Sequence, residues 1–306
     1  MTADKTAKDI RNMRIRGALD IAIAAARAMR KELDGKSTAA VISNLKKSGK
    51  KLKAARPTAV SLPNAVDYVL YLAEKNKKLD AGEFTRTTSK DIQKFIDDQE
   101  RALERIAEIG ANLIDSNDTI LTHCNSDTVV ALFERARKEG KKFKVICTET
   151  RPRFQGHLTA RALAKAKIPT TLVVDSAARL MMKEFKVDKV IVGGDTVLAN
   201  GDLINKIGTS QIAVAARDLD IDFIAAVESI KFSPRSIEGE MAKIEYRDTK
   251  EVIKPGKIRG IKVLNPAFDI TPAEMIDMLI TEEGIIPPQG AYHLLREKFG
   301  WELSSF

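Results

Sequence analysis

Cysteine, aromatic residues and long apolar runs are all scarce in this chain. Its 306 residues include two cysteines, Cys124 and Cys147, with no CxxC spacing and no histidine-rich tract, which argues against a structural zinc site. No apolar run approaches the roughly 20 residues that span a bilayer, and the first residues lack the apolar stretch of a signal peptide. We therefore expect a cytosolic protein without a disulfide between its two cysteines.

Basic residues outnumber acidic ones, and the formal net charge of +9 favours an anionic partner. Much of the surplus lies between Lys36 and Arg56, in a run of five lysines: Lys46, Lys47, Lys50, Lys51 and Lys53. A solvated helix and loop explains this run, with nucleic-acid binding as the functional alternative. Aromatic residues make up only 5% of the chain, so bases have few stacking platforms, and no nucleic-acid-binding motif is present. We expect neither nucleic acid nor membrane as a partner, which leaves a phosphorylated metabolite.

Two patterns of apolar residues divide the chain near residue 115. Before it, apolar residues at three- and four-residue steps predict helices over 6–33, 65–75 and 91–114, with a loop over 56–64. After it, β-rich runs at 119–122, 144–148, 170–174, 189–192 and 223–227 alternate with predicted helices at 126–138, 155–166, 177–185 and 210–219. This alternation predicts an α/β protein, with a helical N-terminal domain over 1–115 and a Rossmann-like parallel-sheet domain over 116–306.

Polar side chains follow nearly every predicted strand. The segments are His123-Cys124-Asn125-Ser126, Glu149-Thr150-Arg151, Asp175-Ser176, Gly193-Gly194-Asp195 and Glu228-Ser229-Ile230-Lys231. In an open parallel sheet, ligands bind beyond the carboxyl ends of the strands. The sequence therefore predicts a ligand site at this edge.

Several segments suit a phosphate group. Ser126 precedes a predicted helix, as does the segment from Asn205 to Ser210, and helix N-termini attract anions. Arg16 offers a planar fork of donors. Dinucleotide and P-loop fingerprints are absent.

Each of these residues also has a structural interpretation. Without a family, Cys124 is more typical of a small buried side chain and His123 of a packed histidine, whereas Asp195 is equally typical of a turn. Lys206 and Lys231 are equally typical of surface cations.

An ordered set of short motifs resembles one known family. The motifs are Arg16-Gly17-Ala18, Arg56-Pro57-Thr58-Ala59-Val60, Thr122-His123-Cys124-Asn125, Glu149-Thr150-Arg151-Pro152 with Gln155-Gly156, Gly194-Asp195, Asn200-Gly201, Asn205-Lys206-Ile207-Gly208-Thr209, Asn265-Pro266, Phe268-Asp269 and Thr271-Pro272. The family contains methylthioribose-1-phosphate isomerase, archaeal ribose-1,5-bisphosphate isomerase, and the alpha, beta and delta subunits of the guanine exchange factor of initiation factor 2. The resemblance covers residues 14–288, nearly the whole chain.

The isomerases of this family carry a cysteine and an aspartate where this chain has Cys124 and Asp195, so the resemblance implies an enzyme. In the methylthioribose-1-phosphate enzyme, aromatic residues suited to a thioether follow the Arg56 motif. Here Ser61-Leu62-Pro63-Asn64 follows it, as in the ribose-1,5-bisphosphate enzyme. The resemblance thus implies conversion of ribose 1,5-bisphosphate to ribulose 1,5-bisphosphate, in salvage of nucleotide-derived ribose. The alternatives are a non-catalytic regulator of translation initiation and methylthioribose-1-phosphate isomerase.

The resemblance also implies roles for individual residues. Asp195 exchanges protons with the sugar oxygens, and Cys124, as a thiolate, removes the proton from carbon 2; a direct hydride shift is the alternative. A thiolate needs nearby cations or a helix N-terminus, and Asp195 must hold a proton to act as an acid. The expected substrate-binding residues are Arg16, Gly17, Ala18, Arg56, Ser126, Arg151, Gln155, Asn205, Lys206 and Lys231. We expect no metal or redox cofactor and a homo-oligomer, either a dimer or a larger ring. A nucleotide activator fits the salvage role.

Overall fold

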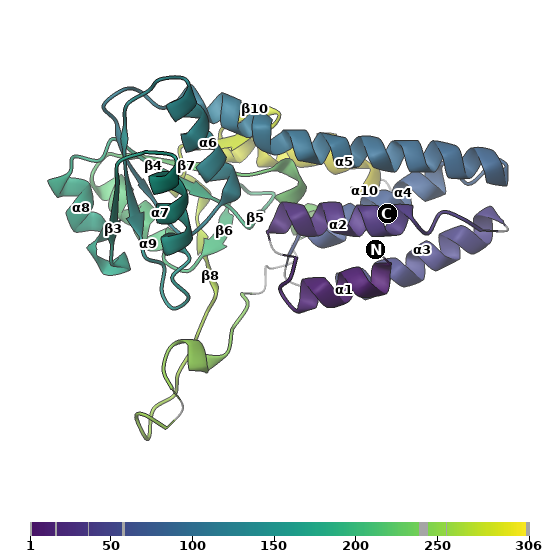
Figure 1. Cartoon of the computed structure of the whole chain (residues 1–306), viewed down its shortest axis with the longest axis horizontal. Helices are drawn as coiled ribbons and strands as arrows, with labels where there is room; N and C mark the ends of the chain where they lie inside the picture. The colour runs from purple at the N-terminus through teal and green to yellow at the C-terminus, as the bar shows by residue number, and fades with distance from the viewer. Residues whose placement is uncertain are drawn as a thin grey trace. The chain divides into compact units, whose positions relative to one another are not determined.

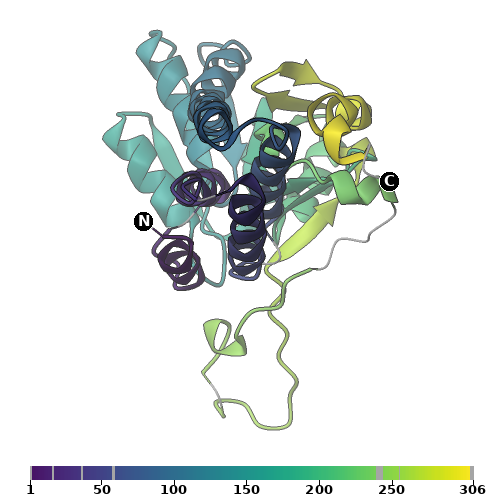
Figure 2. The same cartoon turned by 90° about the vertical axis from the view of Figure 1, so that its right-hand side faces the viewer.

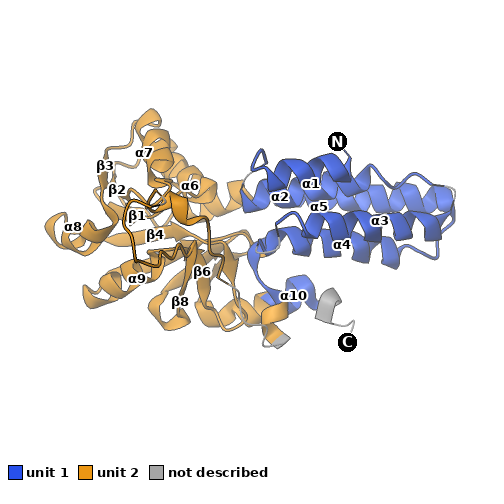
Figure 3. Ribbon diagram, turned by 90° about the horizontal axis from the view of Figure 1, so that it is seen from below, with its two compact units in different colours: residues 1–102, 230–234, 295–306 blue, residues 103–229, 235–294 orange. Residues whose placement is uncertain are grey.

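The computed structural model describes residues 2–15, 17–35, 37–56, 59–238, 244–254 and 256–303. The chain divides into two compact units, which Figure 3 colours separately. The helical unit comprises Met1–Ala102, Ile230–Pro234 and Leu295–Phe306, and the sheet unit comprises Leu103–Ser229 and Arg235–Leu294.

One long helix, α5 (Ala81–Ala111), contributes to both units. Its residues Phe84 and Ile92 belong to the core of the helical unit, whereas Ile106 and Ala111 belong to the core of the sheet unit. The division therefore falls inside a continuous helix, between Ala102 and Leu103, and not at its end. The domain boundary near residue 115 stays a prediction.

The helical unit is built from amphipathic helices around an apolar core. They are α1 (Ala3–Arg11), α2 (Ala18–Arg30), α3 (Thr38–Lys53), α4 (Ser61–Lys75), the first part of α5 and the end of α10 (Ala291–Leu303). In Figure 1, α2 packs against α4, and α1 against α3. Ile21, Met29, Leu45 and Leu62 are fully buried between them. Among the described helices, none combines the length and apolar composition that a bilayer crossing requires.

The predicted helices differ from the observed ones at their starts. Residues 6–33 form α1 and α2 and not one helix, because Met13 and Gly17 adopt φ values of 58° and 79°, which end a right-handed helix. α4 begins at Ser61, not at residue 65. α5 begins at Ala81, not at residue 91, because the Asp80 side chain accepts a hydrogen bond from the Glu83 N–H (2.9 Å) and caps the helix.

The basic run lies on α3, whose start is capped by Ser37. Lys46 pairs with Glu74 at 2.7 Å and Lys51 with Asp4 at 2.8 Å. These lysine side chains are more than half exposed. The structure therefore agrees with the interpretation of this run as a solvated helix.

In the described residues, the sheet unit holds a seven-stranded sheet with the order β10-β9-β7-β4-β1-β2-β3. The strands are β1 (Thr119–Thr122), β2 (Lys144–Thr148), β3 (Thr170–Val173), β4 (Lys189–Gly193), β7 (Asp222–Ala226), β9 (Met278–Thr281) and β10 (Gly284–Ile286). All pairs are parallel except β9 with β10. Buried residues such as Ile120, Val145 and Ile224 form its core. The five predicted strands match β1, β2, β3, β4 and β7 to within one residue at each end, so the predicted α/β fold is confirmed.

Helices connect the parallel strands, as predicted. They are α6 (Asp127–Lys138), α7 (Gly156–Lys165), α8 (Ala178–Glu184) and α9 (Thr209–Asp218). α6 and α9 contact β4, and α7 contacts β2 and β3. Each crossover helix returns the chain to the starting edge of the sheet, so the parallel strands all end at the opposite edge.

A second, antiparallel sheet with the order β5-β6-β8 was not predicted. Its strands are β5 (Thr196–Val197), β6 (Leu203–Lys206) and β8 (Phe268–Thr271). Between β7 and β8, residues 244–254 and 256–267 form a long excursion that extends away from the sheets in Figures 1 and 2. Backbone hydrogen bonds from Arg247 N–H to Asn265 (2.9 Å) and from Ala267 N–H to Glu245 (2.8 Å) close its base. This base brings residues 245–247 next to β8.

Candidate active site

Cys124 and Asp195 follow two strands that lie side by side. β1 and β4 pair directly, with Leu121 opposite Val190, and both strands run toward the same edge of the sheet. Cys124 and Asp195 are partly exposed, so neither is sealed in the apolar core. The negative charge of Asp195 also contributes to raising the pKa of the Cys124 thiol. Their catalytic roles stay a prediction.

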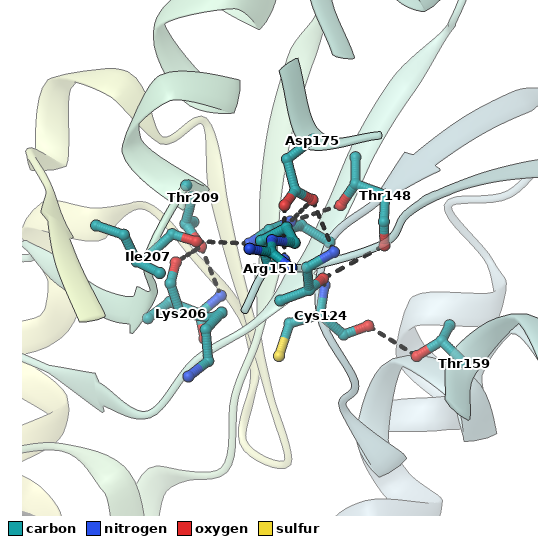
Figure 4. A network of polar contacts seen from close by, with 12 residues as sticks. Cys124, Thr148, Arg151, Thr159, Asp175, Lys206, Ile207 and Thr209 are labelled. Carbon is teal, nitrogen blue, oxygen red and sulfur yellow. Dashed lines mark hydrogen bonds and ion pairs between the residues drawn. The ribbon is translucent and has the colours of Figure 1, made fainter. Parts of the chain in front are cut away.

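The backbone of Cys124 is held in an unusual conformation. Its φ is 67°, in the left-handed region that non-glycine residues rarely adopt. The Cys124 N–H donates to Thr150 Oγ1 (2.9 Å), and its carbonyl accepts from Thr159 Oγ1 (2.8 Å). Figure 4 shows the Cys124 sulfur on the side away from Thr159. Two threonines from different segments thus fix the direction of the sulfur, as functional sites often require.

A Cys124 thiolate would require a lowered pKa, whereas the pKa of this thiol is raised. Burial raises its pKa to about 11, and the charge of Asp195 adds to this rise. Lys206, the backbone N–H of Asn125 and Arg247 lower the pKa, but their combined effect is smaller. The cations that the prediction required are present, and burial outweighs them.

The two glycines before Asp195 allow a close approach of three segments. A Cβ at Gly193 would lie 2.6 Å from Ser126 Oγ, and one at Gly194 would lie 2.7 Å from Leu203 Cδ1. The Asp195 N–H donates to Ile204 C=O (3.0 Å), which attaches it to β6. Asp195 therefore lies between the end of β4, the start of α6 and the second sheet.

Lys206 is a buried cation at the end of β6. Its residue is 6% exposed, and it forms no ion pair within the described part of the chain. Burial lowers its pKa, and the charges of Cys124 and Asp195 counteract this effect. Asn205 turns the other way, and its amide donates to Thr209 Oγ1 (3.1 Å). Of the two predicted residues Asn205 and Lys206, Lys206 lowers the pKa of Cys124 through its positive charge.

Asp269 occupies the start of α9, and phosphate binding by the segment before this helix stays a prediction. One carboxylate oxygen accepts hydrogen bonds from the Gly208 N–H (2.7 Å), the Ser210 N–H (3.2 Å) and the Ser210 hydroxyl (2.9 Å). Burial raises the Asp269 pKa. The protein supplies its own anion at this helix N-terminus. The Phe268-Asp269 motif was a signal for this residue, although no role followed from it.

Ser126 caps α6. Its hydroxyl oxygen accepts a hydrogen bond from the Val129 N–H (3.4 Å), a weak geometry that leaves the start of the helix lightly held. Asp127, the first residue of α6, is exposed and adds negative charge there. Phosphate binding by Ser126 stays a prediction.

Arg151 and Gln155 lie in the turn after β2. Asp175 accepts hydrogen bonds from the N–H groups of Thr150 and Arg151, each at 2.7 Å, and so fixes this turn (Figure 4). The Arg151 guanidinium lies 5.2 Å from the centroid of the Phe154 ring, and the residue is exposed. Gln155 Oε1 is buried with no hydrogen-bond partner among the described residues, as expected for a group that awaits a ligand.

His123 is a structural histidine. Its Nε2 lies 2.9 Å from the Ile207 carbonyl oxygen, which only accepts, so this nitrogen carries the proton. Nδ1 then accepts from the Thr148 hydroxyl at 2.6 Å. Burial lowers the pKa of His123, which keeps the ring neutral.

The remaining predicted residues belong to the helical unit. Arg16 lies outside the described residues. Gly17 precedes α2 with a φ of 79°, Ala18 accepts a hydrogen bond from Ser61 Oγ (2.7 Å), and Arg56 is partly buried. Lys231 is 7% exposed. A joint site with Cys124 and Asp195 stays a prediction.

Three features complete the description of the sheet unit. Within the described residues, no cluster of three or more His, Cys, Asp or Glu side chains has metal-binding geometry. Cys147 is buried in β2, and burial raises its pKa to about 12, as for an inert thiol. Arg247, which no sequence motif indicated, acts on both Cys124 and Lys206.

Comparisons with known proteins cover both units. The model of the initiation factor 2 subunit family matches residues 14–288. The chain is 46% identical to the ribose 1,5-bisphosphate isomerase of Methanocaldococcus jannaschii, covering 97% of this chain and 95% of the relative. It is 44% identical to that of Pyrococcus furiosus, covering 96% and 93%. The solved 5-methylthioribose 1-phosphate isomerase from Pyrococcus horikoshii is similar with a TM-score of 0.78 at 31% identity, covering 98% of this chain and 88% of the other.

Proposed function

The chain belongs to the initiation factor 2 subunit family, and we propose that it isomerises ribose 1,5-bisphosphate to ribulose 1,5-bisphosphate. One observation carries the proposal. Cys124 follows β1, Asp195 follows the neighbouring strand β4, and the Asp195 N–H donates to Ile204 (3.0 Å) in β6, the strand that ends in the buried Lys206. The reaction needs an acid–base group and a cation for a phosphate, and this edge offers both. Two relatives at more than 40% identity carry this activity in their names.

Asp195 exchanges protons in the mechanism that we propose. A sugar 1-phosphate has its anomeric oxygen bound to phosphorus, so the ring must open with that phosphate retained. Asp195 gives its proton to the ring oxygen, and the bond between this oxygen and carbon 1 breaks. The hydrogen on carbon 2 then moves to carbon 1 with its electron pair, while Asp195 takes the proton of the carbon-2 hydroxyl. The carbonyl forms at carbon 2, and Asp195 is protonated again.

The state of Cys124 favours this hydride shift over removal of the carbon-2 proton by a thiolate. Ionising a thiol with a pKa of about 11 at pH 7 costs roughly 5 to 6 kcal/mol, since each pKa unit corresponds to about 1.4 kcal/mol. The two substrate phosphates would raise this cost. A neutral Cys124 instead donates a weak hydrogen bond to the substrate.

We propose that cations and backbone N–H groups bind the substrate's phosphates. Gln155, with its unpartnered oxygen, suits a sugar hydroxyl, and Arg151 lies in the same turn. The assigned phosphate-binding residues are Arg16, Gly17, Ala18, Arg56, Ser126, Asn205, Lys206 and Lys231.

The segment that follows the Arg56 motif favours a bisphosphate over a methylthio sugar. Ser61, Leu62 and Asn64 are buried in α4, and Asn64 donates to the carbonyls of Ile230 and Phe232, each at 2.8 Å. These polar bonds hold the chain on both sides of Lys231. Aromatic side chains that would suit a thioether are absent from this segment.

We also propose that the protein is a homo-oligomer, that it lies in a reducing cytosol and that it takes part in the salvage of nucleotide-derived ribose. Both cysteines are free, and Cys124 is partly exposed, which suits a reducing compartment. Tyr246, Ile258 and Leu264 on the long excursion are 55–62% exposed, as expected for a surface that another copy covers. Light scattering of the purified protein tests this, and a monomer at micromolar concentration would contradict it.

The substrate is tested by offering ribose 1,5-bisphosphate and 5-methylthioribose 1-phosphate to the same preparation. The proposal predicts ribulose 1,5-bisphosphate as product, with kcat/KM for the bisphosphate at least ~100-fold higher, because the methylthio sugar lacks the carbon-5 phosphate and leaves the polar groups that bind it without a partner. Preference for the methylthio sugar would refute the proposal. So would a folded protein that turns over neither sugar but binds initiation factor 2.

A further inference from the structure

Two cations share one aromatic ring beside Cys124. Lys206 Nζ lies 4.9 Å and Arg247 Cζ lies 5.7 Å from the centroid of the Phe268 ring. Lys206 is opposite Phe268 in the β6–β8 pair, and Arg247 comes from the base of the long excursion. The Arg247 side chain is 13% exposed, so both cations are largely removed from water. Cation–π contact with the ring holds their positions.

Two carboxyl groups, Glu245 and Asp195, offset part of the effect of these cations on each other. Arg247 Nε pairs with a Glu245 carboxylate oxygen at 3.0 Å, but Lys206 has no ion-pair partner within the described ranges. Arg247 disfavours the charged form of Lys206, as expected for like charges held close together. Keeping two cations together in a partly buried place is costly unless an anion binds there. A guanidinium and an ammonium on one ring match a phosphate group, which accepts a bidentate pair from arginine and a point contact from lysine.

We propose that Arg247 is a substrate-binding residue that, together with Lys206, holds the phosphate on carbon 1, with Phe268 positioning both cations. This inference rests on the proposed function. Carbon 1 is favoured over carbon 5 because the Cys124 sulfur, at the reacting end of the sugar, lies on the side of Lys206 in Figure 4, and Arg247 shares the Phe268 ring with Lys206. The carbon-5 phosphate lies at the far end of the substrate. The assignment adds one residue to the site that no motif indicated.

Calorimetric binding of two ligands tests the assignment. Ribulose 1,5-bisphosphate has a carbon-1 phosphate, and ribose 5-phosphate lacks it. We expect Arg247→Gln to raise the Kd of the bisphosphate roughly 10- to 100-fold and to leave the Kd of ribose 5-phosphate within about twofold. Arg247→Lys keeps the charge but not the fork, so its effect is intermediate. In turnover, Arg247→Gln raises KM more than it lowers kcat.

Two further variants separate binding from folding. Arg259→Gln, an exposed arginine on the same excursion, leaves both Kd values unchanged. Phe268→Leu raises the Kd of the bisphosphate about 3- to 10-fold, whereas Phe268→Tyr, which keeps the ring face, stays near wild type.

Three results would overturn the assignment. Arg247→Gln binding the bisphosphate like wild type would remove Arg247 from the site, and equal weakening of both ligands would place it on the other phosphate or in a structural role. A wild-type protein that binds neither ligand would refute the proposed function itself, and the assignment with it.

Discussion

Replacing Asp269 by asparagine tests how the segment that carries Lys206 is held. One Asp269 oxygen accepts hydrogen bonds from the Gly208 N–H, the Ser210 N–H and the Ser210 hydroxyl, at 2.7 to 3.2 Å. An asparagine oxygen in the same place has no charge and attracts these donors less. If the amide turns round, its NH₂ group faces the same donors and none of the bonds survives.

The expected cost follows from the kind of bond that is lost. A hydrogen bond to a charged group contributes about 1.5–3 kcal/mol, and loss of an N-cap costs about 0.5–2 kcal/mol. Burial raises the Asp269 pKa, so desolvation of the carboxylate offsets part of this gain. We therefore expect Asp269→Asn to lower the free energy of unfolding of the sheet unit by about 2 kcal/mol. KM should rise as well, since Lys206 lies two residues before Gly208.

Urea unfolding followed by far-ultraviolet circular dichroism measures this change, with a lower midpoint and an unchanged m-value. Asp218→Asn is the matched control, because Asp218 is the last residue of α9, the helix that Asp269 caps. It is 54% exposed and pairs with Arg179. Its loss should cost less than ~1 kcal/mol. The reasoning is refuted if Asp269→Asn costs no more than Asp218→Asn.

Three further predictions concern the edge of the sheet. Asp195→Asn should lower kcat about 10²- to 10⁴-fold without loss of fold, and wild-type turnover would remove Asp195 from the mechanism. Cys124→Ser keeps a hydrogen-bond donor and should lower kcat less, so a loss as large as that of Asp195→Asn would contradict the neutral thiol. Gly156→Ala should lower the free energy of unfolding by more than ~2 kcal/mol, and Tm with it, because its Cβ would lie 1.8 Å from the Thr148 carbonyl oxygen. An unchanged Tm would contradict this contact. Burial lowers the pKa of His123 below its usual 6.5, so below about pH 6.5 the unfolded chain takes up a proton that the folded chain does not, and Tm should fall. In His123→Gln, Tm should depend less on pH, and an equal dependence in both proteins would contradict the neutral buried ring.

The sheet was predictable because its signals are local. Each of the five parallel strands is a short β-rich run bounded by a turn and a helix, so its bounds follow from the residues themselves. The strand ends then placed Cys124 and Asp195 at one edge, because parallel strands that alternate with helices end on the same side. The two side chains are 71 positions apart in sequence, yet β1 and β4 are neighbours.

Features that depend on distant contacts were not predictable. β5, β6 and β8 are two to four residues long and form a sheet only through pairing with one another. Arg247 reaches the site through an excursion of irregular structure, where periodicity gives no signal. The thiol of Cys124 was expected to ionise because a helix start follows it and lysines were expected nearby, but burial, which depends on the folded surroundings, has the largest effect on its pKa.

The central claim is tested most directly with ribose 1,5-bisphosphate that carries deuterium on carbon 2, incubated with the wild-type protein in ordinary water and followed by nuclear magnetic resonance. The account predicts ribulose 1,5-bisphosphate with the deuterium retained on carbon 1. Unchanged sugar in the presence of folded protein would contradict the isomerase, and product that has lost its deuterium to water would contradict the hydride shift with a neutral Cys124.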